Sequence, residues 1–101
     1  SHNQQGGITA YQVNIQPGDR VLDGSQLQSK LDEHQFNDIR IKTAWGDQEA
    51  FRFATQTKNY LVANGYSVKN IVHAMYSKPI QGQHINPVGD DGVLEIVIGG
   101  R

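Results

Sequence analysis

Apolar and polar residues alternate in two segments of the first half of the chain in a way that predicts strands. Over residues 11–16 the apolar side chains of Tyr11, Val13 and Ile15 alternate with polar ones, which is the period of a strand with one solvated face. Residues 17–19 read Pro-Gly-Asp and predict the turn that ends it. Residues 39–43 show the same alternation and predict a second strand with one solvated face.

Two segments carry a helical period instead. Ser25 and Gln28 have the spacing of a capping box, and the helix that follows is expected to reach about Gln35. Asp47 is the expected N-cap of a longer second helix. Its buried stripe is predicted to be Ala50, Ala54, Thr57 and Leu61, and its end is predicted at a left-handed Gly65 followed by Tyr66.

The last two predicted strands, residues 71–76 and 93–98, are largely apolar on both faces. This pattern is typical of central strands, or of strands whose outer face meets a partner. The connector between them, residues 77–91, contains two prolines. Connectors of this length are often functional, so we predict a binding element there, and deletion of residues 82–86 is expected to leave the fold intact.

Together these elements predict an α/β (α+β) two-layer sandwich in the order βαβαββ. A mixed four-stranded sheet would carry two helices on one face, joined by right-handed crossovers, and leave its other face open. Residues 8–101 are expected to form one domain. Residues 1–7 are interpreted as a cloning remnant, Ser1-His2, followed by a flexible lead-in, as expected for a domain taken from a longer, anchored protein.

Composition removes several functional classes. The chain has 101 residues and a formal net charge of −1, and its cations are scattered, so we expect no nucleic-acid partner. The absence of cysteine excludes a catalytic thiol, a thiolate zinc site and disulfides, and it fits the periplasm and the cytoplasm equally. No apolar run is long enough to span a bilayer.

From Ile39 onward the chain resembles the OmpA-like, peptidoglycan-binding domain family of outer-membrane proteins, lipoproteins and flagellar stators. The similar segments are the strand ending near Asp47, the helix from Ala54 to Gly65, the proline-bearing residues 77–80 and the closing strand 93–98. The resemblance implies a βαβαββ fold in the cell envelope or periplasm. It also implies a diaminopimelate ligand held by Asp47 and by an arginine on the following helix.

The sequence departs from the family at that arginine. The family's arginine immediately precedes the helix alanine, whereas here Phe53 precedes Ala54 and Arg52 stands one position earlier. One step along a helix rotates a side chain by about 100°, so Arg52 need not point where the family's arginine points. The resemblance therefore speaks for the fold more than for the ligand.

Candidate chemistry is sparse. His34, His73 and His84 lack the spacing of metal ligands, and Asp90-Asp91 precedes Gly92 as a turn signal. No nucleophile elbow, phosphate-binding loop or zinc-protease motif occurs, so we expect no enzyme activity, no cofactor and no metal. The candidate ligand-binding residues lie at the corner after residues 39–43 and in the connector: Trp45, Asp47, Arg52, Lys78, His84 and Asn86.

The sequence thus predicts a non-catalytic binding or assembly module of the bacterial cell envelope, whose partner is an envelope protein or a cell-wall component. One alternative is a genuine peptidoglycan binder. The other is an oligomerisation or protein-docking domain that uses the open sheet face and can pair with a second copy. In that case Ile71, His73, Met75 and Val97 would form an apolar patch around Glu95.

Overall fold

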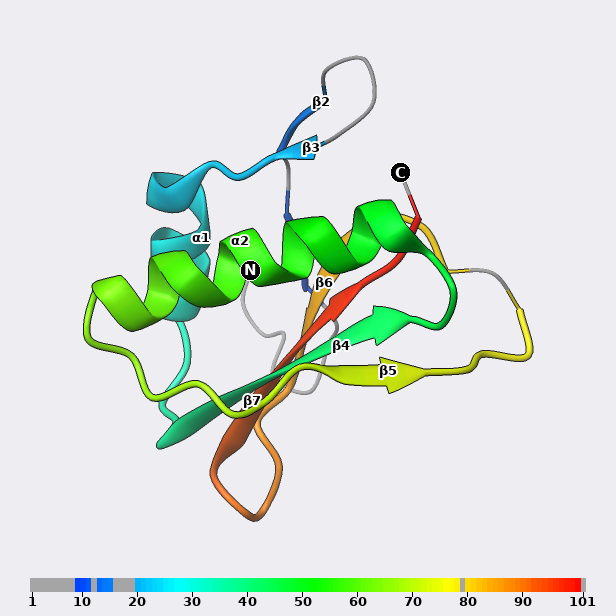
Figure 1. The fold of residues 1–101 in the computed structure, drawn as a ribbon. Coiled ribbons are helices and arrows are strands. Elements are labelled where there is room, and N and C mark those ends of the chain that lie inside the picture. The colour runs from blue at the N-terminus through cyan, green and yellow to red at the C-terminus, as the bar shows by residue number, and fades with distance from the viewer. Residues whose placement is uncertain (1–8, 12, 16–19, 79, 101) are drawn as a thin grey trace.

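The computed structural model describes residues 9–11, 13–15, 20–78 and 80–100. The lead-in at residues 1–7 and the turn at residues 17–19 lie outside them. Within these described ranges, two helices and seven strands follow one another (Figure 1). They are β1 (Thr9–Tyr11), β2 (Asn14–Ile15), β3 (Arg20–Val21), α1 (Gly24–Leu31), β4 (Asp38–Ala44), α2 (Gln48–Ala63), β5 (Val72–Ala74), β6 (Gln83–Asn86) and β7 (Val93–Ile98).

The main sheet is mixed and five-stranded, in the order β1-β6-β7-β4-β5. β4 runs parallel to both β7 and β5, whereas β6 is antiparallel to both β1 and β7. Strands β2 and β3 form a separate antiparallel pair that projects from the sheet (Figure 1). The predicted α+β architecture is confirmed in outline, but the sheet has five strands where four were predicted.

One face of the sheet forms the core. The register places Ile39 beside Leu94 and Ile41 beside Ile96, and Ile85 of β6 pairs with Ile96 from the other side. All five side chains are fully buried. The same cluster contains the buried residues of both helices, so α1 and α2 cover the same face: Leu27, Leu31, Ala50, Phe53, Ala54 and Leu61.

Helix α2 begins and ends where its local sequence predicts. An Asp47 side-chain oxygen accepts a hydrogen bond from the Ala50 N–H at 2.9 Å, which satisfies one of the free donors of the first turn. At the other end Gly65 has φ +89°, and the Tyr66 N–H donates to the Leu61 carbonyl at 3.0 Å. This is the Schellman geometry that a left-handed glycine permits.

Helix α1 does not begin at the predicted capping box. Its N-cap is Asp23, whose side chain accepts from the Gln26 N–H at 3.1 Å, and the helix ends at Leu31 instead of near Gln35. Gln28 does not reach back to Ser25, because its side-chain oxygen accepts the Tyr60 hydroxyl of α2 at 2.9 Å. A tertiary contact therefore replaces the local one.

The strand predicted over residues 11–16 is divided in two. Its first part belongs to β1, in which Tyr11 pairs with Gln83 of the main sheet, and its second part is β2, which pairs with β3. Residues 12 and 16 lie outside the described residues. Alternation predicts extended backbone and a buried face, but it does not specify which strand becomes the neighbour.

The connector after residue 76 was predicted to lack secondary structure, and this prediction is wrong. Residues 83–86 form β6, an interior strand of the sheet, and Ile85 is fully buried. A segment as short as this carries too little periodicity to be recognised as a strand between two prolines. The expectation that residues 82–86 could be deleted without loss of the fold is therefore withdrawn.

The predicted strand 71–76 is also shorter than expected, and it is not central. β5 covers only Val72–Ala74 and forms an edge of the sheet. Its apolar residues remain partly exposed, because no described segment covers their outer side. By contrast β7, whose sequence has the same apolar character, is interior and largely buried.

Candidate binding site at the carboxyl edge of the sheet

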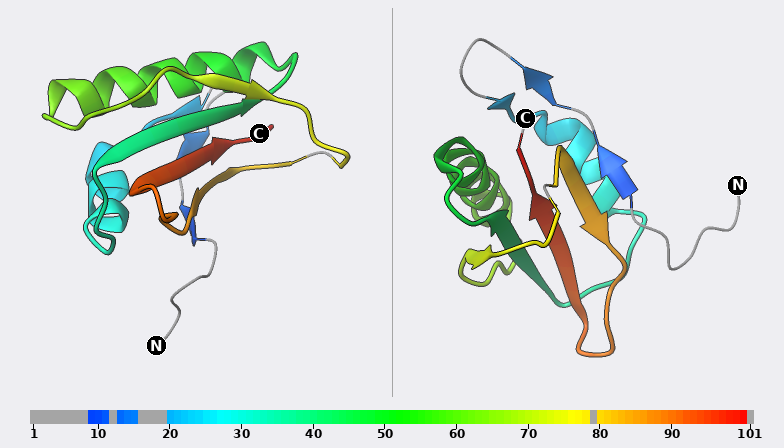
Figure 2. Two further views of the ribbon diagram at one scale, coloured as in Figure 1. Left: turned by 90° about the horizontal axis from the view of Figure 1, so that it is seen from below. Right: turned by 90° about the vertical axis from the view of Figure 1, so that its right-hand side faces the viewer.

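The parallel strands β4, β5 and β7 end at the same edge of the sheet, and α2 begins there. The β5–β6 connector runs out past β4 and β5 and turns back to β6 (Figure 2). Its return is held by backbone hydrogen bonds between residues 80–82 and the end of β7: Gly82 N to Gly100 O at 2.7 Å, Gly99 N to Gly82 O at 2.8 Å and Gly100 N to Ile80 O at 2.8 Å. Ligands of open α/β sheets bind at this kind of edge.

Three hollows meet at Ile80, which lines all of them. The first, about 590 Å³, lies at the β4–α2 corner and is lined by residues 44–48, 80, 81 and 100. The second, about 370 Å³, lies beneath the connector and is lined by residues 44, 45, 74–78 and 80. The third, about 330 Å³, is on the sheet face opposite the helices, lined by Lys42, Tyr76, Ile80, His84, Asn86, Glu95 and Val97.

Trp45 stands between the first two hollows and lines both. Its side chain is 67% exposed, and its ring meets His73 edge-on with the centroids 5.9 Å apart. The Trp45 N–H donates to the Ala74 carbonyl at 2.9 Å, which fixes the corner to β5. Gly46 follows with φ +84°, a conformation that lets the chain turn from the strand into α2.

Glu95 organises the hollow on the open face. Its carboxylate accepts the Asn86 amide at 2.8 Å and lies 3.1 Å from Lys42 Nζ and 3.9 Å from Arg40 Nη1. These contacts neutralise the carboxylate and hold Asn86 and Lys42 in place along the hollow. At its margin His84 Nε2 donates to the Gln81 carbonyl at 2.8 Å, which ties β6 to the connector.

Tyr76 lies between the second and third hollows and lines both. Burial raises the pKa of its hydroxyl; nearby Lys42 lowers that pKa and Glu95 raises it by smaller amounts. The group is therefore a neutral phenol at physiological pH. It can donate a hydrogen bond while its ring offers an apolar surface to a ligand.

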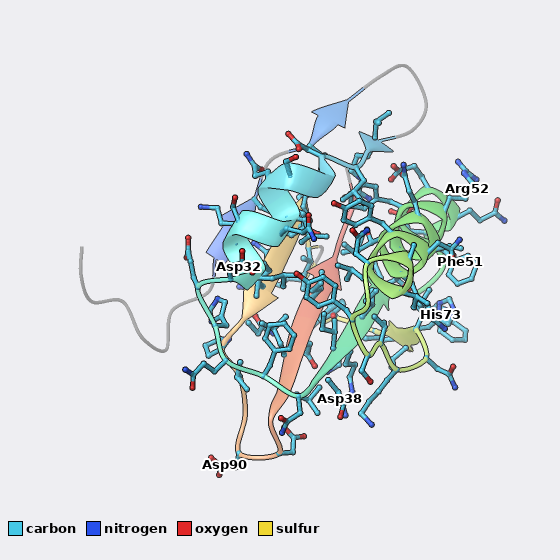
Figure 3. The ribbon with its side chains drawn as sticks, turned by 90° about the vertical axis from the view of Figure 1, so that its left-hand side faces the viewer. Asp32, Asp38, Phe51, Arg52, His73 and Asp90 are labelled. Atoms are coloured by element: carbon cyan, nitrogen blue, oxygen red, sulfur yellow. The ribbon has the colours of Figure 1, made fainter. Side chains whose placement is uncertain are left out.

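The structure distributes the six predicted site residues over this edge without bringing them into one pocket. Trp45 and Asp47 line the first hollow, Trp45 and Lys78 the second, and His84 and Asn86 the third. Arg52 is exposed on α2, on the same side of the molecule as Phe51 and His73, and lines none of the three (Figure 3). Phe53, which immediately precedes Ala54, lies in the core.

Sequence reasoning missed Ile80, Tyr76, Lys42 and Glu95 as site residues. Lys42 and Glu95 lie on the solvated face of strands that were predicted correctly, but their proximity depends on the β4–β7 register. Ile80 is brought to the site by backbone hydrogen bonds to a segment about 20 positions away. The one available local signal was the long connector itself.

A buried ionic cluster beneath this edge was also missed. Arg20 is only 3% exposed, and its guanidinium donates to both carboxylate oxygens of Glu49, at 3.1 and 2.6 Å. It also donates to the Gly99 carbonyl at 2.5 Å and the Gln83 side chain at 3.3 Å, and it lies 5.0 Å from the centre of the Phe53 ring. Arg20 thereby joins β3, α2, β6 and the end of β7.

The prediction of an apolar patch around Glu95 is wrong, because the strand register places some of its residues on the opposite face of the sheet. His73 pairs with Thr43 and lies on the helix side, with its Nδ1 3.2 Å from Thr43 Oγ1 and its ring stacked on Phe51 at 5.1 Å (Figure 3). Val97 does share the open face with Glu95, because it pairs with Lys42. The alternation of side chains across a strand separates these residues.

Among the described residues there is no group of three or more His, Asp or Glu side chains that could hold a metal ion. The same residues include no helix long and apolar enough to cross a bilayer. Comparisons with models of protein families, with curated proteins and with solved structures find no match to this chain.

Proposed function

We propose that this chain is a non-catalytic binding module of the bacterial cell envelope, acting in the periplasm, and that it receives a cell-wall or envelope-protein component in the hollows around Ile80. The observation that carries the proposal is the convergence of three hollows on one residue, with an exposed tryptophan between two of them. Concave sites with an aromatic wall and a few fixed polar groups are typical of ligand binding.

The hydrogen bonds and ion pairs of the carboxylates at this edge favour binding over catalysis. A general base needs a lone pair directed at the substrate. Glu95 instead accepts from Asn86 and lies between two cations, and one oxygen of Asp47 is engaged by the first turn of α2. With these contacts, Glu95 and Asp47 are suited to fixing the shape and the charge of a binding site, and not to accepting a proton from a substrate.

The charge pattern suggests the ligand. Asp47 and Lys78 line the two hollows on either side of Trp45, so an anionic and a cationic group lie on either side of an apolar ring. A fragment that carries both an ammonium and a carboxylate, as diaminopimelate does, would match this pattern. The assignment to the envelope rests on the resemblance of residues 39–98 to OmpA-like domains.

The experiment is a titration followed through Trp45, the only tryptophan of the chain. A diaminopimelate-containing muropeptide is expected to change the indole fluorescence saturably and to shift the backbone amide signals of Trp45 and Asp47. Lys78→Gln should weaken the binding, whereas the control Lys30→Gln, on α1, should not. No change at Trp45 or Asp47 up to millimolar muropeptide would exclude the cell-wall form of the proposal.

A further inference from the structure

Among the strands that the structure describes, β5 forms an unpaired edge of the main sheet. It is the last strand in the sheet order, and its inner side is bonded to β4 through Val72 and Ala74, with the Ala74 carbonyl accepting the Trp45 N–H. Successive residues of a strand direct their backbone groups to opposite sides. The N–H and C=O groups of His73 therefore point away from the sheet, with no described strand beside them. The Met75 N–H also points away, because it lies opposite the inward Ala74 carbonyl in one trans peptide unit. Such an edge is a template for another strand.

Exposed apolar side chains gather at this edge. Five of the six large apolar residues that the described part of the chain exposes lie on β5, beside it, or on the segments that contact it. Met75 is 82% exposed, and the rings of Trp45 and Phe51 both contact His73. Apolar surface concentrated in this way marks interaction sites on soluble proteins. The five residues are Trp45, Phe51, Val72, Met75 and Tyr76.

The charge around β5 indicates an acidic partner. Residues 50–89 contain no Asp or Glu, and the exposed Lys69 and Lys78 stand on either side of the strand. In an antiparallel pair of β5 strands from two copies, the segment before β5 in one copy, with Lys69, would lie beside the segment after β5 in the other, with Lys78. Like charges side by side oppose pairing, so the edge is poorly suited to a second copy.

From these observations we infer that the outer edge of β5 binds an extended peptide segment of another protein, in which apolar and acidic residues alternate. The segment adds as a sixth strand. Its backbone bonds to His73 and Met75, its apolar side chains pack against the exposed aromatic residues, and its carboxylates meet Lys69 and Lys78. The inference extends beyond the proposed function, because the site is the strand edge and the partner is a polypeptide.

Two substitutions of Met75 test whether the peptide forms backbone hydrogen bonds with the edge of β5. Met75→Pro removes the outward N–H, while Met75→Ala removes the same side chain and keeps that N–H. The probe is a fluorescein-labelled peptide of about eight residues with alternating valine and glutamate, a typical strand length. The proline variant should bind it about fivefold more weakly than the alanine variant, as expected for the loss of one net hydrogen bond.

Lys69→Glu tests whether the positive charge beside β5 attracts the acidic peptide. Lys30→Glu, on α1, is the control, because it changes the net charge equally. At low salt Lys69→Glu should weaken peptide binding at least about twofold relative to the control, and the difference should shrink as salt is added. A peptide with lysine in place of glutamate should bind far more weakly to the wild type than the acidic peptide does.

Equal binding by the proline and alanine variants, or equal binding of the acidic and basic peptides, would overturn the inference. So would a dimer in sedimentation that Met75→Pro dissociates, because the edge would then pair with a second copy. If Met75→Pro does not fold, protection of the His73 and Met75 amides from hydrogen exchange on addition of the peptide decides instead. The muropeptide titration is independent of these results, so the two proposals can fail separately.

Discussion

Arg20 offers the sharpest test of how the carboxyl edge is held together. Replacing Arg20 with alanine removes the guanidinium that neutralises Glu49 and that donates hydrogen bonds to the Gly99 carbonyl and the Gln83 side-chain oxygen. Its side chain is 1% exposed and that of Glu49 12%, so water cannot readily replace these contacts.

The expected cost follows from this burial. Breaking a buried ion pair by removing one partner costs about 3–5 kcal/mol, because a desolvated charge remains. Arg40 provides a matched control: its guanidinium lies 3.9 Å from Glu95 but its side chain is 34% exposed. Arg40→Ala should therefore cost less than about 1 kcal/mol.

Urea unfolding followed by circular dichroism measures both variants. For a domain of this size a loss of about 3 kcal/mol lowers the midpoint of thermal unfolding by roughly 12–24 °C. In urea, with a slope of about 1.5 kcal/mol per molar, the midpoint should fall by about 2 M. The Arg40→Ala midpoint should stay within about 0.7 M of the wild type on the same slope.

An Arg20→Ala variant as stable as Arg40→Ala would refute this reasoning. A further variant separates charge from packing. Arg20→Met combined with Glu49→Leu removes both charges and fills much of their volume, so it should recover a large part of the lost stability. Recovery by the double variant, and not by Arg20→Met alone, would show that the loss of the Arg20 charge beside Glu49, and not the lost volume, causes the destabilisation.

Three other predictions concern single residues. Ile85→Ala in β6 should cost about 2–5 kcal/mol in denaturant unfolding, and a cost below about 1 kcal/mol would mean that this strand is not part of the core. The Tyr11 hydroxyl is buried without a described hydrogen-bond partner, so Tyr11→Phe should stabilise the domain by about 1 kcal/mol in thermal unfolding at neutral pH. Burial raises the pKa of Tyr11, and nearby Arg20 partly offsets this increase. Above about pH 10 the tyrosine ionises in the unfolded chain before it ionises in the folded one, so the wild type should lose stability there. The phenylalanine variant, which has no hydroxyl at this position, should lose less. Asp47→Ala should cost about 1 kcal/mol through the lost N-cap, whereas Asp47→Asn should be close to the wild type; equal losses would exclude the cap as the cause.

Local signals in the sequence determined the elements that depend on neighbouring residues. The start of α2 at Asp47 and its end at Gly65 were predicted because a cap involves groups within one or two turns of the chain. The strands β4 and β7 were predicted because alternation, or a run of apolar residues, is contained within each strand.

Only the tertiary structure decided which elements are neighbours. β5 and β7 have similar apolar sequences, yet one is an exposed edge and the other an interior strand, because strand order depends on pairings between distant segments. Arg20 meets Glu49 across 29 positions of sequence, and Ile80 reaches the three hollows through bonds to Gly100. No local period encodes such contacts. The candidate site consists mainly of them, which is why the sequence predicted the corner at Trp45 and Asp47 but not the hollows around it.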